Sequence, residues 1–523
     1  MLRTALLTAT LALAAGALHA QDSRLPDIGS SAAELITPAK EAEYGAMMIA
    51  QLRHYDILLE DPLVDSWLDT LGQRIAAASD DPRRSYTFFM MRERDINAFA
   101  TLGGYVGVNA GLVLAADRED EVAGVLAHEV AHVTQEHVLR GVERAQRDQL
   151  PILLAMLGAV AVANSAGGNS ADDAAQAAIV GAMGLAQQRQ IDYTRANESE
   201  ADRLGIQALA RGGFDPAGMA DFFVKLQARS RTNAASLYGE TPDYLRTHPM
   251  TTTRITEAKE RVERVRATQT RFGGDMRSDN PLLPGGLAVG ASLGTGRTGV
   301  FEFARERLRV LSAPTPPDAI REYEAFERVR KLSDAERYGL AVAHLQAGRP
   351  QQALPVLAAL GDAHPGNAWI ELTRAEAESR AGNHAAADAR FEALLRRTPT
   401  SRPVALTYAR MLGERGSAAA GRRAQAVLRP LMAGAADDAV FQRTFARASE
   451  IAGDTVRAGE AHAEATYLSG RPELALVQLD NLKKREDLDY YARARVEARI
   501  AAITPTVLEL RRQGIRDRDV ERD

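Results

Sequence analysis

The sequence predicts a mainly α-helical protein of the α+β class, with a small antiparallel sheet in its first half and a helical solenoid in its second half. A chain of 523 residues is too long for a single core and should hold two or three folded units. Only 5% of the residues are aromatic and alanine is abundant, which favours close-packed helices over a β-sandwich. Long stretches have helical apolar spacing, and the second half repeats with a period of 34 residues.

The composition excludes several classes of protein and site. The net charge of -5 gives no basic surface for a nucleic acid. The chain has no cysteine, which excludes disulfides, cysteine zinc ligands, a thiol nucleophile and a lipid anchor attached to cysteine.

The first twenty residues, MLRTALLTATLALAAGALHA, have the pattern of a secretory signal peptide. Arg3 precedes a short apolar run, and small residues follow up to residue 20. The run is shorter than the ~20 residues that a membrane-spanning helix needs, so a membrane anchor is the less favoured alternative. An exported chain without cysteine fits a bacterial periplasm, and we expect that location.

Residues 21–268 are predicted to form the first domain. Helical spacing extends to about residue 85, and strand-like stretches follow at 86–91, 96–100 and 105–108. Gly103 and Gly104 mark a turn, so these stretches predict an antiparallel meander. One long helix is expected at 119–143, and helical spacing resumes from 189 to 266.

Two further segments of the chain lack the pattern of an ordinary domain core. Residues 150–190 hold two apolar stretches around a polar loop, which predicts a helical hairpin. It is either part of the core or a lid, and peripheral membrane contact is a minority interpretation. Residues 269–315 are rich in glycine and proline and are predicted to be a linker.

Residues 316–505 repeat at intervals of 34 residues and resemble tetratricopeptide repeats. Such repeats are pairs of antiparallel helices that stack into a solenoid with a concave binding face. The third repeat is degenerate, with Gly421 where alanine is expected, and residues 506–523 are predicted to be a charged tail. The positions that share the period are Gly348, Gly382 and Gly416, Ala341, Ala375 and Ala409, Pro365 and Pro399, and Ala353 and Ala387.

The segment VLAHEVAHVT carries the pattern HExxH in a helix-length apolar window. His128 and His132 are four residues apart, which puts both rings on one face of a helix. Two such imidazoles can bind one Zn²⁺, with Glu129 directed at the water on the metal. The alternative is a buried helix with a hydrogen-bonded histidine pair. His137 lies five residues past His132, so we expect it to point off the metal face and to be structural.

A catalytic zinc ion needs a third protein ligand and an open position. In NESEADRLG, Glu198 and Asp202 are four residues apart on a predicted helix. One can reach the metal while the other holds a ligand histidine in place. Glu200 faces elsewhere in this register. The alternative is a solvated helix face, and these residues alone do not decide between the two carboxylates.

HEVAH followed 70 positions later by ESEAD, with NAFATLGG before and THPMTTTR after, resembles the HtpX–BepA class of zinc peptidases over about residues 30–265. The resemblance implies a gluzincin-type peptidase domain that binds one Zn²⁺ per chain. It implies His128, His132 and Glu198 as zinc ligands and Glu129 as general base. Asp202 would be the partner of a ligand histidine. Leu102 departs from the family pattern, in which proline often precedes the two glycines.

The resemblance also gives a role to His248 in THP and to Arg254 six residues later. The family histidine can approach the zinc. It either fills the open coordination position and keeps the enzyme inactive, or acts with the arginine to stabilise the oxyanion. The sequence does not choose between these roles.

The combination of signal peptide, peptidase domain and repeats resembles the periplasmic proteases of this class that act on outer-membrane β-barrel proteins. It implies a zinc endopeptidase with chaperone-like activity in quality control and assembly. Its partners would be unfolded or misassembled substrates and, through the repeats, the barrel assembly machinery. The alternative is a non-catalytic chaperone or adaptor. An extended substrate would pair by β-addition with the strand around Asn97, Ala98, Phe99 and Ala100.

Overall fold

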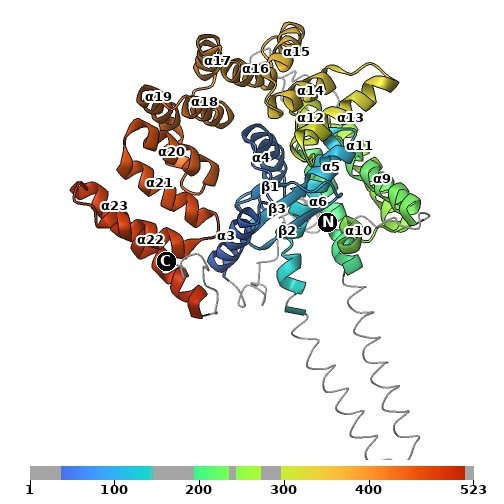
Figure 1. The fold of residues 1–523 in the computed structure, drawn as a ribbon. Coiled ribbons are helices and arrows are strands. Elements are labelled where there is room, and N and C mark those ends of the chain that lie inside the picture. Colours follow the sequence, from blue (N-terminus) through green and yellow to red (C-terminus); the bar gives the residue numbers. More distant parts are fainter. Residues whose placement is uncertain (1–36, 142, 145–193, 235–242, 273–295, 513–523) are drawn as a thin grey trace, which may run out of the picture.

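The computed structural model describes residues 37–141, 143–144, 194–234, 243–272 and 296–512. The predicted signal peptide and the predicted hairpin at 150–190 lie outside the described residues. Within the described ranges, no helix combines the length and apolar character needed to cross a bilayer. The structure is mainly helical with one small sheet, as predicted (Figure 1).

The sheet has three strands, β1 (Thr87–Met91), β2 (Ala98–Thr101) and β3 (Tyr105–Asn109), in the order β1-β3-β2. β2 and β3 are antiparallel, and the turn between them contains Gly103 and Gly104 with positive φ values of 76° and 79°. The predicted glycine turn is therefore confirmed.

The prediction of a purely antiparallel meander is wrong, because β1 pairs with β3 in the parallel direction. Gly107 lies in the central strand, between β1 and β2. It is paired with Phe89 on one side and Phe99 on the other, and a Cβ on Gly107 would lie 2.7–2.8 Å from both rings. The glycine leaves room for the two rings to meet edge to face at 5.8 Å.

Helices surround this sheet. α3 and α4 precede it, α5 and α6 follow β3, and the helix at residues 194–211 crosses α6. α6 ends at Thr134, so the long helix predicted for 119–143 is interrupted. The interruption lies at Glu136, which has a left-handed φ of 51°. The bounds are α3 (Pro38–His54), α4 (Pro62–Ala77), α5 (Ala110–Ala115), α6 (Glu119–Thr134), α9 (Ala217–Ala234), α10 (Asp243–Thr247) and α11 (Thr252–Phe272).

The second half forms the predicted helical solenoid. Gly348, Gly382 and Gly416 all have positive φ in turns between helices. The glycine at position 421, where the repeat pattern has alanine, is explained by close packing. A Cβ on Gly421 would lie 2.4 Å from the backbone nitrogen of Ala452. The bounds are α14 (Asp334–Gln346), α15 (Pro350–Ala363), α16 (Ala368–Arg380), α17 (His384–Arg397), α18 (Arg402–Glu414), α19 (Ala418–Leu428), α20 (Ala439–Ala452), α21 (Thr455–Leu468), α22 (Pro472–Lys483) and α23 (Tyr490–Arg512).

The helices differ from the predicted bounds of the linker and of the C-terminal tail. Helix α12 (Phe301–Leu311) lies inside the predicted 269–315 linker and is followed by α13 (Pro316–Val329). α12 is ordered because its apolar side chains, such as Leu308, are buried. At the other end, α23 continues into the predicted 506–523 tail, where Val507 is buried.

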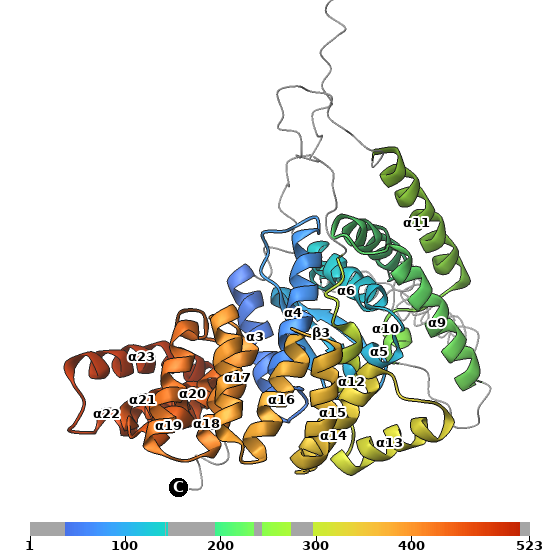
Figure 2. The ribbon, with the colours of Figure 1, turned by 90° about the horizontal axis from the view of Figure 1, so that it is seen from above.

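The solenoid curves around the first half of the chain, so that α4 lies inside its arc (Figure 1; seen from above in Figure 2). α12 and α18 pack on α4, and a single hydrophobic cluster extends from Leu59 to Ala461. A buried ion pair crosses the same interface, where the guanidinium of Arg307 donates to both carboxylate oxygens of Asp61 at 2.8 and 2.7 Å. The two halves therefore share one core.

Candidate metal centre

α6 is a buried helix whose first turn is held by acidic side chains. Glu119 accepts hydrogen bonds from the indole of Trp67 and the backbone of Thr298, and Glu121 accepts one from Lys225. Negative charge at this end also interacts favourably with the helix dipole. α6 is thereby fixed at its N terminus, and its second half presents His128, Glu129 and His132 to one site.

The two histidines of α6 face each other as the HExxH spacing predicts. Their Nε2 atoms lie 3.0 Å apart. His128 is fully buried, and Glu129 is 1% exposed. Among the described residues, Oε1 of Glu129 has no hydrogen-bond partner, and Nε2 of His248 lies 3.7 Å from it.

The helix at 194–211 brings the predicted acidic pair to the same place. This helix approaches α6 closely at Gly205, because the glycine has no Cβ. A Cβ at this position would lie 3.1 Å from the backbone of Ala127. The carboxylate of Glu198 lies 3.4 Å from Nε2 of His128 and 3.3 Å from Nε2 of His132. Asp202 lies on the far side of His128, with Oδ1 3.0 Å from Nδ1 of that ring. Glu198 thus faces the ligand nitrogens and Asp202 supports one ring from behind.

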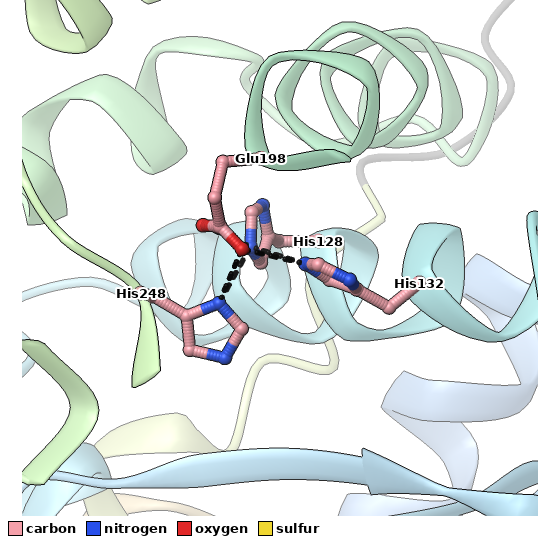
Figure 3. Close-up of side chains that lie close together, drawn as sticks. All are labelled: His128, His132, Glu198 and His248. Atoms are coloured by element: carbon pink, nitrogen blue, oxygen red, sulfur yellow. Dashed lines mark hydrogen bonds and ion pairs between the residues drawn. The ribbon is translucent and has the colours of Figure 1, made fainter. Parts of the chain in front are cut away.

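His248 follows α10 and completes a cluster of four possible ligands (Figure 3). One ligand atom each from His128, His132, Glu198 and His248 lies within 4.8 Å of the others. Nδ1 of His248 is 2.9 Å from Oε1 of Glu198 and 3.4 Å from Nε2 of His128. The structure thus places His248 beside the ligand atoms and between them and Glu129.

Arg254 contacts the acidic pair of the site, and this differs from the oxyanion role that the family resemblance allowed. Its guanidinium donates to both oxygens of Asp202 at 2.8 Å, and Nη1 lies 2.7 Å from Oε2 of Glu198. Nη1 also donates to the carbonyl of Pro249 at 3.0 Å. These donors are already engaged with the acidic pair, so this arrangement favours a positioning role for Arg254 over contact with substrate.

The charges of the site are strongly coupled. Burial would lower the pKa of His128, but Asp202 and Glu198 outweigh it and raise the pKa to about 10. Burial would raise the pKa of Glu198 and of Asp202, but the neighbouring His128 outweighs it, so both pKa values lie below their ordinary range. Both carboxylates are therefore ionised at neutral pH.

This donor set fits a divalent metal ion. The ionised carboxylates of Glu198 and Asp202 are buried, and Arg254 and the proton on His128 balance them when no metal is bound. A metal ion would replace that proton, because a histidine binds a metal only when it is neutral. Buried charge of this kind is costly without a counter-ion. Two or three imidazole nitrogens and one carboxylate oxygen are the ligands that zinc takes in catalytic sites. Residues of the site thus fit Zn²⁺ in both charge and chemistry.

Three side chains of the site were not predicted from the sequence. His137 contacts the back of His132, with their Nδ1 atoms 2.9 Å apart, and its Nε2 lies 3.2 Å from Glu200. Burial and the neighbouring His132 lower the pKa of His137 to about 4. Tyr244 stacks on His248 at 4.6 Å and is fully buried. Tyr244 on α10 and His248 just after this helix are four residues apart, and that spacing was the available signal for the tyrosine.

The strand predicted to pair with substrate is β2, which lies at an edge of the sheet among the described residues. Ala98, Phe99 and Ala100 pair with β3, and the carbonyl of Asn97 accepts a hydrogen bond from Asn109. β2 packs beside α6, so the edge runs past the helix that carries the HExxH residues.

Comparisons with known proteins match both halves of the chain. The model of peptidase family M48 matches residues 62–262, and a tetratricopeptide repeat model matches residues 337–411. The β-barrel assembly-enhancing proteases of Escherichia coli K12 and Yersinia pestis are both 31% identical to this chain, over 71% and 75% of it. A Vibrio cholerae protein that bears the same name provisionally is 36% identical over 66% of the chain. The matches cover 69%, 74% and 64% of these relatives, respectively.

Proposed function

Since the chain belongs to peptidase family M48, we propose that it is a zinc-dependent endopeptidase. The observation that supports this most directly is the cluster of His128, His132, Glu198 and His248 within 4.8 Å, beside the buried carboxylate of Glu129. A helix that merely buried a histidine pair would have no need for the two ionised carboxylates of Glu198 and Asp202 beside it.

The ligands would be His128, His132 and Glu198, and a bound zinc ion would polarise the peptide carbonyl and acidify water. Glu129 would accept a proton from water and deliver it to the leaving amine. Its Oε1 atom is suited to this, because it lacks a hydrogen-bond partner among the described residues. The free edge of β2 would hold an extended substrate by main-chain hydrogen bonds, which suits unfolded clients because it reads little side-chain identity.

We expect the wild-type protein to hold one zinc ion, and Glu198→Ala to weaken zinc binding by more than about 100-fold. The effect should exceed the 10–100-fold that is typical for partners behind a ligand, because Glu198 itself faces both histidine nitrogens. Competition with a chelator measures the dissociation constant. Glu509→Ala, an exposed change on α23, is the control. A wild-type affinity in Glu198→Ala would show that this carboxylate is not a ligand.

His248 would keep the site closed. Its ring lies 2.9 Å from Oε1 of Glu198 and 3.7 Å from Oε1 of Glu129, where it would compete with a water molecule that both carboxylates have to reach. This geometry supports the inhibitory role over the oxyanion role. Opening would require the His248 segment to move away from the ligands, which fits a protease that must spare folded neighbours.

His248→Ala is therefore expected to raise casein cleavage by about tenfold or more. A hydrogen bond to a charged group contributes about 1.5–3 kcal/mol, and ~1.4 kcal/mol corresponds to tenfold. The rate of the purified variant is compared with wild type and with His462→Ala, which changes an exposed histidine of the solenoid. A fall in kcat would instead assign His248 to the oxyanion.

We further propose that the protein works in the periplasm, in the quality control and assembly of outer-membrane β-barrel proteins, with chaperone-like activity. The predicted signal peptide and the names of the relatives support this. The solenoid would contact the barrel assembly machinery. The second candidate is an adaptor that works mainly by binding, and the structure offers a specific reason to retain it: a site occupied by His248 is a closed site.

A further inference from the structure

His137 lies behind His132, on the side away from the four ligand atoms. Its Nδ1 atom is 2.9 Å from Nδ1 of His132, and its Nε2 atom is 3.2 Å from Oε2 of Glu200. The residue is 5% exposed, whereas the side chain of Glu200 is 32% exposed. The three side chains thus form a continuous series that leads from an imidazole of the metal centre to a carboxylate at the surface.

The hydrogen atoms of this series have one consistent arrangement. Nε2 of His132 faces the cluster, 3.0 Å from Nε2 of His128 and 3.3 Å from Oε1 of Glu198. When that nitrogen serves as a ligand, the proton of the neutral ring must be on Nδ1. This N–H then donates to Nδ1 of His137. The proton of His137 is consequently on Nε2, where it donates to Glu200.

The backbone is bent in a way that makes the series possible. In an uninterrupted helix, a residue five positions after His132 would point about 140° away from it, given 3.6 residues per turn. The chain instead leaves the helix after Thr134 and passes through Glu136 at a φ of 51°. A left-handed conformation is strained for a non-glycine residue. The turn returns His137 to the ring of His132, so the strained residue has an identifiable effect at the site.

The surroundings of Glu200 keep it suited to accept a hydrogen bond. Nη1 of Arg140 lies 3.6 Å from Oε2, and Nη2 of Arg203 lies 3.8 Å from Oε1. Both cations lie within ion-pair distance of the carboxylate. The arrangement repeats, at the other ligand histidine, what Asp202 does for His128 with Arg254 behind it.

We propose that His137 and Glu200 are positioning residues that hold His132 in its ligand tautomer and orientation. The inference rests on the proposed zinc site and extends it, since it assigns a role to two residues that are not among the four clustered ligand residues. The site then has two supports of different kinds, a buried one at His128 and one that reaches the surface at His132.

The test compares His137→Leu with His137→Asn in the full-length protein, with zinc affinity measured by chelator competition. The leucine keeps apolar volume but accepts no hydrogen bond, so affinity is expected to fall by about 10–100-fold. The amide oxygen of asparagine can replace Nδ1 as the acceptor, so most of the affinity should return. With zinc saturating, kcat should follow the same order while KM stays unchanged. His462→Leu, at an exposed histidine, is the matched control.

Wild-type affinity in His137→Leu, or an equal loss in the leucine and asparagine variants, would overturn the proposal. The unfolding midpoint of each metal-free variant reports whether packing alone has changed. Should His137→Leu not fold, Glu200→Ala decides, because its carboxylate is partly exposed. It is expected to weaken zinc binding severalfold with Glu200→Gln between it and wild type, and an unchanged affinity in Glu200→Ala contradicts the proposal. A wild-type protein that binds no zinc would instead refute the proposed function.

Discussion

Glu129→Gln is expected to lower kcat for casein by about 10²–10⁴-fold, the range that general acid–base catalysis contributes. Glutamine has nearly the same shape as glutamate but cannot take a proton from water. Because Glu129 is not among the clustered ligand residues, zinc content should stay at the wild-type level. Because it lies at the floor of the site, KM should change little. Steady-state kinetics and metal analysis on the same preparation check all three statements.

The control for this variant is Glu43→Gln, an isosteric change at an exposed position of α3. If Glu129→Gln retains activity within tenfold of wild type, the general base is a different group. The same variant also separates the two proposed functions in the cell. If it fully restores outer-membrane protein assembly in a strain that lacks the wild-type protein, the binding function is the main one.

Arg307→Ala is expected to lower the free energy of unfolding by about 3–5 kcal/mol, because it leaves Asp61 as an uncompensated buried charge. The side chain of Arg307 is 5% exposed, and the ion pair joins α12 to the N terminus of α4. Asp61 also caps α4 through hydrogen bonds from Leu63 and Val64. Loss of the arginine therefore affects the helix at the centre of the interface. Urea unfolding followed by circular dichroism measures the change.

A double variant tests the physical reason for that loss. Arg307→Met with Asp61→Asn removes both charges and keeps a side chain that can cap α4, so a large part of the stability should return. Arg447→Ala is the matched control, because its ion pair with Glu450 is exposed and should contribute less than about 1 kcal/mol. If Arg307→Ala and Arg447→Ala lower the free energy of unfolding equally, the buried ion pair stabilises the protein no more than the exposed one does.

The parts of the site that follow a helical repeat could be predicted from the sequence. His128 and His132, and Glu198 and Asp202, are each four residues apart, and the fold places them as that spacing predicts. The assignment of Glu198 over Asp202 depended on the family resemblance. In the structure Asp202 lies 3.0 Å from Nδ1 of His128, and the choice of Glu198 as the ligand stays a prediction.

The features that the sequence did not predict depend on tertiary contacts. The parallel pairing of β1 with β3 is set by the path of the chain between the strands, which strand propensity does not encode. The break at Glu136 carries no glycine or proline, so nothing in the local sequence signals a left-handed residue there. His137 consequently seemed remote from the site. α12 was not predicted from the sequence because it directly follows a glycine-rich stretch.

The way in which α12 and α18 pack on α4 has a consequence for experiments that dissect the chain. The peptidase half and the solenoid cannot be treated as autonomous modules, because each supplies part of the other's interior. A deletion of the repeats would expose the apolar side of α4 that α18 covers. Loss of activity in such a truncated chain would report on its folding, so point variants on the solenoid surface are the sound way to separate docking from catalysis.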